Sequence, residues 1–130
     1  MKESQKERFR ALAKEHGLVQ DDFWKASQGF VIITRTGIEK VQRSLGIEVS
    51  YEVVPEFSDV SSGLYVVKAI GCNKDKQVES FGEASPKNCR NAYPVAMAEK
   101  RALSRVVLKM ADMYELGVYG EDEGDFKRND

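Results

Sequence analysis

The segment from Val95 to Tyr114 places the strongest constraint on the fold, because apolar side chains recur there at helical spacing. At about 100° per residue, five of them fall on one arc and two more lie at its margin. The arc consists of Ala98, Ala102, Val106, Met110 and Met113, with Leu103 and Val107 at the margin. Pro94 suits the first turn of such a helix. We therefore expect one long amphipathic helix that packs its apolar arc against the rest of the core.

Shorter segments upstream show the patterns of β-strands. Residues 30–33 are continuously apolar, and residues 47–54 alternate between apolar and polar side chains. Two further strands are predicted at residues 64–72 and 77–85, joined by a turn at residues 73–76. The predicted order is helix, strand, short helix, antiparallel strands and long helix, which indicates an α+β fold. We expect an antiparallel sheet of three to four strands with the long C-terminal helix packed on one face.

The 130 residues suffice for a single hydrophobic core. Residues 1–28 are expected to form an N-terminal helix and a connector, and residues 29–119 the α+β core domain. Residues 120–130 are acidic and low in hydrophobicity, which predicts a flexible tail. No apolar run approaches the roughly 18 residues of a membrane span, and the charged N-terminus has no signal-peptide core. We therefore expect a cytoplasmic protein that does not enter a membrane.

The sequence contains few of the residues that catalysis or metal binding requires. His16 is the single histidine, and Cys72 and Cys89 form no CxxC pair. The glycines match no phosphate-binding motif. Nothing in the sequence brings Glu83 and Glu99 together as an acid and a base. The sequence therefore predicts a protein that is not an enzyme and has no metal or cofactor, and it leaves the redox state of the two cysteines open.

Positive charge gathers on the polar side of the long helix, although the formal net charge of the chain is only -1. Arg101, Arg105 and Lys109 form a stripe with a spacing of four residues, and Lys100 lies on the same polar half. From Lys87 to Lys109, six residues are basic and one is acidic. A stripe of one sign repels itself, which favours contact with an external anion such as a phosphate backbone. The alternative is a stripe that is solvated or paired within the chain.

Other basic residues could extend this surface. A short helix is predicted at residues 37–46, and Lys40 and Arg43 lie off its apolar face, where a solvated face is the alternative. Arg90 precedes the long helix. The predicted DNA-binding residues are therefore Lys40, Arg43, Arg90, Lys100, Arg101, Arg105 and Lys109. The acidic tail is a candidate internal partner that masks the stripe. Under that hypothesis, deletion of residues 121–130 should strengthen DNA binding at low salt.

The combination of a strand, "SFGEAS", a polar linker and "AMAEKRALSRVVLK" resembles the Rad52-like single-strand annealing superfamily, which includes small annealing proteins of phages and mobile elements. Residues 30–120 follow the outline of that superfamily, an antiparallel sheet whose last strand carries a glycine, followed by a long helix rich in alanine and basic residues. The glycine here is Gly82, which is expected to permit a bulge or a close approach of the helix. The resemblance implies ATP-independent binding of single-stranded DNA and annealing of complementary strands in recombination or repair. It also implies a homo-oligomer, as a ring or a helical filament, with DNA in a basic groove.

Carried onto this sequence, the resemblance matches Arg101, Arg105 and Lys109 to the basic positions of the long helix, and Lys40 and Arg43 to those of the preceding helix and sheet. The physical mechanism would be neutralisation of phosphates with release of counterions, which gives little sequence preference and a steep salt dependence. A function from a different class is the alternative. In that interpretation the chain is a non-enzymatic protein-interaction or regulatory module whose basic helix docks an acidic partner.

Overall fold

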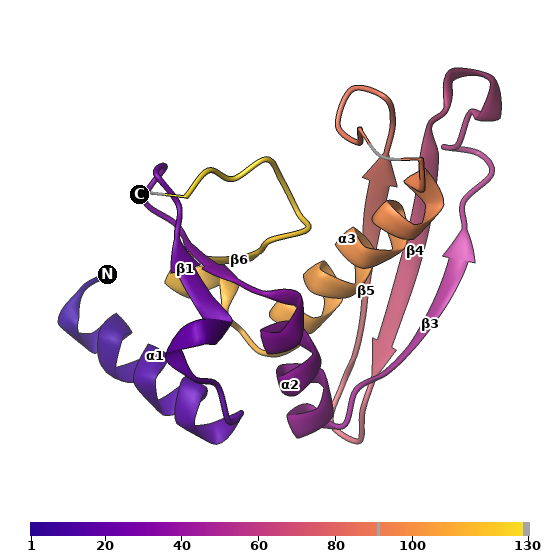
Figure 1. Cartoon of the computed structure of the whole chain (residues 1–130). Coiled ribbons are helices and arrows are strands. Elements are labelled where there is room, and N and C mark those ends of the chain that lie inside the picture. Colours follow the sequence, from indigo (N-terminus) through magenta and orange to yellow (C-terminus); the bar gives the residue numbers. More distant parts are fainter. Residues whose placement is uncertain (91, 129–130) are drawn as a thin grey trace.

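The computed structural model describes residues 1–90 and 92–128, and within them it shows an α+β fold with two three-stranded sheets (Figure 1). The helices are α1 (Glu3–Glu15), α2 (Arg35–Leu45) and α3 (Pro94–Met110). The strands are β1 (Phe23–Lys25), β2 (Val31–Ile33), β3 (Glu48–Val53), β4 (Tyr65–Cys72), β5 (Gln77–Ala84) and β6 (Val118–Gly120). Short 3-10 turns lie at Gln20–Asp22, Val60–Ser62 and Tyr114–Leu116. The predicted α+β class is confirmed.

The larger sheet has the strand order β3-β4-β5 and is antiparallel throughout. α3 packs across one face of this sheet, on β4 and β5 (Figure 1). The apolar arc predicted for the long helix is buried, because none of its five side chains is more than 2% exposed. The sheet and the helix packing therefore confirm the predicted arrangement.

Gly82 on β5 allows α3 to approach the sheet closely. A Cβ atom at Gly82 would lie 2.1 Å from the carbonyl oxygen of Ala98 and 2.5 Å from the backbone nitrogen of Ala102. The β4–β5 pairing continues without interruption through this position, where Val67 lies opposite Gly82. The glycine therefore serves the helix contact and forms no bulge.

The smaller sheet was not predicted from the sequence apart from its central strand. β2 pairs with β1 in the antiparallel sense and with β6 in the parallel sense. β1 and β6, like β2, have only three residues. Three residues are too few to show the alternation of apolar and polar side chains that indicates a strand. β1 lies within residues 1–28, so the segment predicted as a connector contributes a strand to the core.

The segment 121–128 packs back onto the rest of the chain. The backbone N–H of Ser27 donates to the carbonyl of Lys127 at 2.8 Å, and Ala26 and Arg128 form an isolated bridge. The backbone N–H of Arg35 donates to the Glu121 carboxylate at 2.6 Å. The boundary expected at residue 120 therefore does not separate a detached tail, and the flexibility expected for this segment stays a prediction. Residues 129–130 lie outside the described residues.

Candidate nucleic-acid interface

The seven basic residues predicted to bind DNA do not form one exposed surface. Three of them form hydrogen bonds or ion pairs with other residues of the chain: Lys40, Arg101 and Arg105. The other four have no ion-pair partner among the described residues and lie in different places, and these are Arg43, Arg90, Lys100 and Lys109. The expectation of a continuous basic stripe on α3 is therefore corrected.

Arg101 is buried and donates hydrogen bonds to backbone carbonyls. Its side chain is only 7% exposed. Nε donates to the carbonyl of Asp122 at 2.9 Å, and Nη1 donates to the carbonyl of Glu83 at 2.8 Å. Asn88 receives two more hydrogen bonds, at its side-chain oxygen (3.0 Å) and at its carbonyl (2.6 Å). The guanidinium therefore points into the protein, where it joins three segments, and its position does not support the predicted exposed contact with phosphate.

Arg105 is neutralised by carboxylates of its own chain. Nη1 and Nη2 donate to the two carboxylate oxygens of Glu83 at 3.0 and 3.1 Å, and Nη1 also donates to the carbonyl of Phe81 at 2.7 Å. The carboxylate of Glu123 lies 3.5 Å from Nε. Burial works against the charged form, but the hydrogen bonds to Glu83 and the charges of Glu83 and Glu123 together outweigh it and raise the pKa of Arg105. This residue is therefore part of an internal ion pair rather than of an open basic surface.

Together, the two arginines occupy hydrogen-bonding groups at the outer edge of β5. Residues four apart on a helix are separated by about 6 Å along its axis, and residues two apart on a strand by about 6.6 Å. This match lets Arg101 and Arg105 reach the carbonyls of Glu83 and Phe81, which point away from β4. The spacing of four residues suggested a DNA-binding stripe. In the structure it lets Arg101 and Arg105 bind the outward carbonyls at the edge of the sheet.

Lys40 forms an ion pair with a buried carboxylate in the turn Gln20–Asp22. Its Nζ lies 2.8 Å from the carboxylate of Asp22, which is only 3% exposed. Burial would raise the pKa of Asp22, but hydrogen bonds from Lys40 and from the backbone of Val19 hold it below its ordinary value. An ionised pair in this position ties α2 to the preceding turn, so Lys40 is a structural residue here and not an exposed cation.

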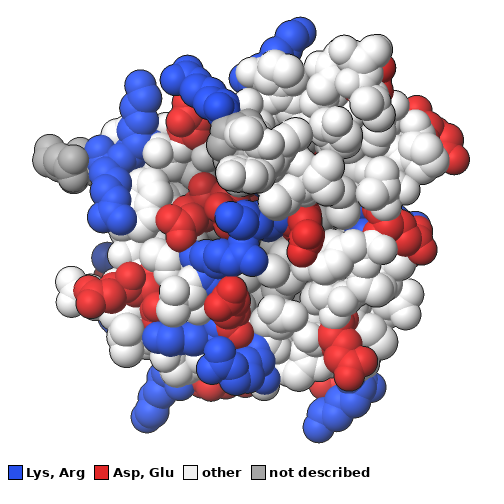
Figure 2. Space-filling model, turned by 45° about the vertical axis from the view of Figure 1, so that its right-hand side comes forward, with Lys and Arg blue, Asp and Glu red and all other residues white. Residues whose placement is uncertain are grey.

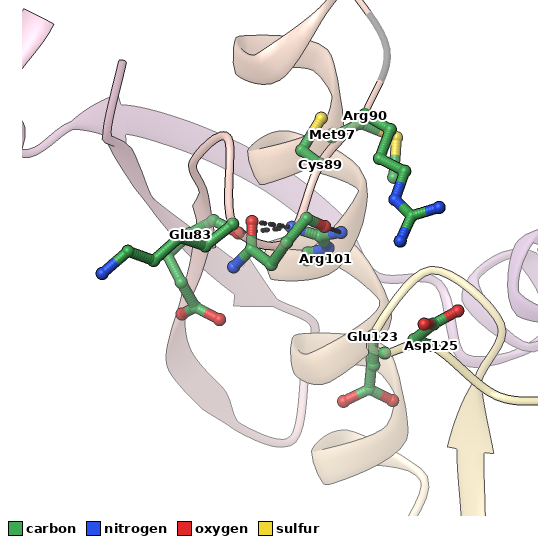
Figure 3. A pocket seen from close by; sticks show the side chains of 10 residues that line it. Glu83, Cys89, Arg90, Met97, Arg101, Glu123 and Asp125 are labelled. Atoms are coloured by element: carbon green, nitrogen blue, oxygen red, sulfur yellow. Dashed lines mark hydrogen bonds between the residues drawn. The ribbon is translucent and has the colours of Figure 1, made fainter. Parts of the chain in front are cut away.

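Arg90 lies at a cavity of about 380 Å³ beside the first turns of α3 (Figure 3). Lys87, Arg90 and Arg101 contribute positive charge to its lining, and Glu83, Glu123 and Asp125 contribute negative charge. Glu123 is largely buried, and burial raises the pKa of its carboxyl group despite its hydrogen bonds to Tyr114 and to the backbone N–H of Gly120. A cavity of such mixed charge does not form a simple anion site.

An open groove of about 740 Å³ runs between α2 and β3. Arg43 and Gln42 of α2 line one side, and Tyr51 of β3 lines the other with a ring that is 37% exposed. Leu103 of α3 forms part of the lining, and the half-buried Lys100 lies one turn before it on the same side of the helix. Of the predicted residues, Arg43 lines this groove together with an accessible aromatic ring, and Lys100 does not line it.

Tyr51 and Gln42 were not among the predicted site residues. The alternation of residues 47–54 placed Tyr51 on the inner face of its strand and therefore indicated a core side chain. The structure leaves that face of β3 open, because α3 covers β4 and β5. The one available signal was an aromatic residue on an edge strand, and the sequence does not reveal which strand lies at the edge.

Carboxylates moderate the charge of the groove. Glu39 and Glu48 line it, and the Nε atom of Arg35 lies 3.3 Å from the Glu39 carboxylate. Burial and the nearby Glu99 carboxylate raise the pKa of the Tyr51 hydroxyl, while Arg35 opposes the change. Figure 2 shows that basic and acidic side chains also lie next to each other near the centre of the face that it presents.

The remaining candidate, Lys109, lies near the other end of α3. It borders a shallow hollow together with Asp112, Tyr114 and Glu115. The side chain is exposed, and the neighbouring Asp112 and Glu115 are paired with Lys76 and Arg8. The structure therefore does not bring Lys109 together with Arg43.

Residues 1–90 and 92–128 contain no group of three or more histidine, cysteine, aspartate or glutamate side chains placed to hold a metal ion. In the same residues, every helix is too short or too polar to cross a bilayer. In comparisons with known proteins, no family model matches the chain and no curated protein matches it significantly.

Proposed function

We propose that this protein binds single-stranded DNA in the groove between α2 and β3 and promotes the annealing of complementary strands without ATP. The contacts differ from those expected from the sequence. Arg43 in the groove, with Lys100 on the neighbouring turn of α3, replaces the buried Arg101 and the ion-paired Arg105 as the contacts to phosphate. Tyr51 supplies a surface for a base. The resemblance to single-strand annealing proteins supports the annealing part of the proposal.

The composition of the groove is the observation that carries the proposal. Proteins that bind single strands without sequence preference combine a groove with basic side chains and aromatic rings on which bases stack. Arg43 has no ion-pair partner among the described residues, and the ring of Tyr51 lies across the groove from it. Gln42 adds an amide that can donate to phosphate or base oxygens. The groove is open to solvent, which suits an extended polymer.

The carboxylates in the groove determine how strong the binding can be. Glu39 and Glu48 repel phosphate, and Arg35 is already paired with Glu39. A single copy therefore offers only a few uncompensated positive charges, and we expect weak binding that is detectable mainly at low salt.

Fluorescence anisotropy with labelled single-stranded DNA at several salt concentrations tests this proposal. Replacing Arg43 with glutamine should weaken binding and reduce the salt slope by roughly 0.7, the share of one phosphate contact on a single strand. Replacing Tyr51 with alanine should cost about 1–3 kcal/mol, or roughly 5- to 150-fold in affinity, whereas Tyr51→Phe should retain most of the binding.

Arg10→Gln is the matched control. It removes one exposed positive charge on α1, which lies away from the groove, and should leave the affinity nearly unchanged (Figure 1). Binding that is insensitive to Arg43 and Tyr51, or equally sensitive to Arg10, would exclude the groove as the DNA site. An annealing assay with complementary oligonucleotides then measures whether bound strands are paired faster than free strands.

A protein-interaction module is the second candidate function, and a different surface favours it. The face of the larger sheet that α3 does not cover carries Glu48, Glu52 and Glu79, and the last two lie beside Lys68. Such an acidic face suits a basic partner rather than the acidic partner expected from the sequence. Absence of DNA binding at low salt, together with a folded protein, would favour this candidate.

A further inference from the structure

β3 forms an exposed edge of the larger sheet. Among the described strands, β3 pairs only with β4, and in Figure 1 no other element lies beyond it. Five of its six residues are exposed, including Val53 at 58%. An unpaired strand edge is a template for another strand, and proteins usually protect such edges with lysine, proline or a bulge. β3 contains no lysine or proline, and its pairing with β4 is regular.

The hydrogen-bonding groups at this edge can be assigned from the β3–β4 pairing. The backbone N–H of Val54 donates to the carbonyl of Val66, so the even-numbered residues of this segment direct their backbone groups toward β4. The N–H and C=O groups of Val49, Tyr51 and Val53 therefore point outward, because successive residues of a strand alternate. No hydrogen bond between the described residues uses these six groups.

The opposite edge of the same sheet is already occupied. The outward carbonyls of Phe81 and Glu83 on β5 accept hydrogen bonds from Arg105 and Arg101. A strand from a second copy therefore cannot pair there without displacing both guanidinium groups. A head-to-tail continuation of the larger sheet from β3 to β5 is thus blocked, whereas pairing of β3 with β3 of another copy is not.

We propose that β3 pairs in the antiparallel sense with β3 of a second copy, around a two-fold axis at Tyr51. In this register Val49 lies opposite Val53 of the second copy, and the two Tyr51 residues lie opposite each other. All of the outward backbone groups are then satisfied, in six hydrogen bonds. Apolar side chains face each other on the inner face of the joined sheet, and a cross-strand pair of this kind adds to stability.

Charge selects this register over its neighbours. On the outer face it places Glu52 opposite Ser50 of the second copy and Glu48 opposite Val54. A register centred on Ser50 would instead set Glu48 directly opposite Glu52 twice, and one centred on Glu52 would oppose the two Glu52 carboxylates. A two-fold axis perpendicular to the sheet keeps the inner faces together, so the grooves of the two copies would open on the same side. The proposal does not depend on DNA binding and is tested without DNA.

The mass of the protein in solution tests the dimer. Light scattering coupled to size-exclusion chromatography, over a range of concentrations, should approach twice the chain mass of 14.6 kDa. Val53→Pro should shift the protein to the monomer, because it removes two of the six hydrogen bonds and leaves the β4 pairing intact. Val53→Thr, which keeps the N–H, should remain dimeric. Circular dichroism confirms that each variant is folded.

Disulfide formation tests the register independently of these variants. Two proteins are prepared in a Cys72→Ser, Cys89→Ser background, one with Ser50→Cys and one with Glu52→Cys. Directly opposite residues at non-hydrogen-bonded positions have Cα atoms about 4.5 Å apart, which suits a disulfide. A mixture of the two proteins should therefore cross-link under mild oxidation, and neither protein alone should do so efficiently.

A monomer at all concentrations, without cross-linking of the mixture, would overturn the proposal. The same holds for efficient cross-linking of either protein alone, which indicates another register, and for a larger assembly whose mass is unchanged by Val53→Pro in a folded protein. DNA binding by a monomer would leave the proposed function intact while excluding the dimer, so the two proposals fail separately.

Discussion

At the scale of single residues, Arg101 shows how a guanidinium group can hold backbone carbonyls that no other element reaches. Its hydrogen bonds join α3 to the end of β5, to Asn88 in the following loop and to Asp122 in the C-terminal segment. Arginine suits this position because its donors are spread over a rigid plane, whereas lysine concentrates three donors on one atom. The residue is therefore basic for a structural reason.

We expect Arg101→Lys to destabilise the protein by roughly 2–4 kcal/mol, because several buried carbonyls lose their donors. For a chain of this size the melting temperature should fall by on the order of 10 °C. Thermal unfolding followed by circular dichroism measures the effect. Lys109→Ala, on the same helix but exposed, is the matched control and should change the stability by less than about 0.5 kcal/mol. Equal stability of the Arg101 variant and the wild type would contradict the structural role.

At the scale of elements, the contact between α3 and β5 positions Arg101 and Arg105 and determines which strand stays uncovered. The helix can lie this close only because Gly82 has no side chain beneath the backbone of Ala98 and Ala102. This close approach brings Arg101 and Arg105 within reach of the edge of β5. It also leaves β3 uncovered, which exposes the ring of Tyr51 and opens the groove beside α2.

We expect Gly82→Ala to destabilise the protein by about 1–3 kcal/mol, because the added methyl group overlaps backbone atoms that cannot move aside without shifting the helix. The melting temperature, measured by calorimetry or circular dichroism, should fall accordingly. Gln77→Ala provides the control, since it alters an exposed position on the same strand. A gain in stability from the alanine, as expected for a glycine in an unconstrained strand, would show that the helix packs less closely.

At the scale of the whole molecule, the C-terminal segment connects the two sheets. Val118–Gly120 completes the smaller sheet as β6, and the residues that follow return across the face of α3. Glu123 accepts hydrogen bonds from the backbone N–H of Gly120 and from the Tyr114 hydroxyl, and it lies beside Arg105. Acidic residues in this segment are thus part of the packing around α3, which bears on the hypothesis that they mask basic residues from DNA.

We expect Glu123→Ala to lower the stability by roughly 2–3 kcal/mol, because it leaves a buried N–H and a hydroxyl without their acceptor and removes one of the two carboxylates beside Arg105. Denaturant unfolding measures this loss. Asp125→Ala is the control, since this exposed carboxylate lies in the same segment. Deletion of residues 121–130 should destabilise the protein further, so any gain in DNA binding on deletion counts toward masking only at a temperature where the truncated protein stays folded. Wild-type stability of the Glu123 variant would indicate that the segment does not hold the fold.

The sequence by itself determined the features that depend on local periodicity. The long helix with its buried arc, the three antiparallel strands and the glycine under the helix were all predicted, because apolar spacing reports which side of an element is buried. The three-residue strands β1 and β6 were missed, because they contain too few residues to repeat a pattern.

Only the tertiary structure decided what the polar side chains do. Periodicity places Arg101 and Arg105 on the polar side of α3, but it does not reveal that the carbonyl edge of β5 and the segment 121–123 lie against that side. Likewise, the alternation of β3 assigns Tyr51 to the inner face without showing that α3 stops short of it. A polar side chain finds its partners on segments that are distant in the chain. The charge pattern therefore predicts on which side of a helix a basic residue lies. It does not predict whether that residue contacts solvent, a phosphate or the protein's own backbone.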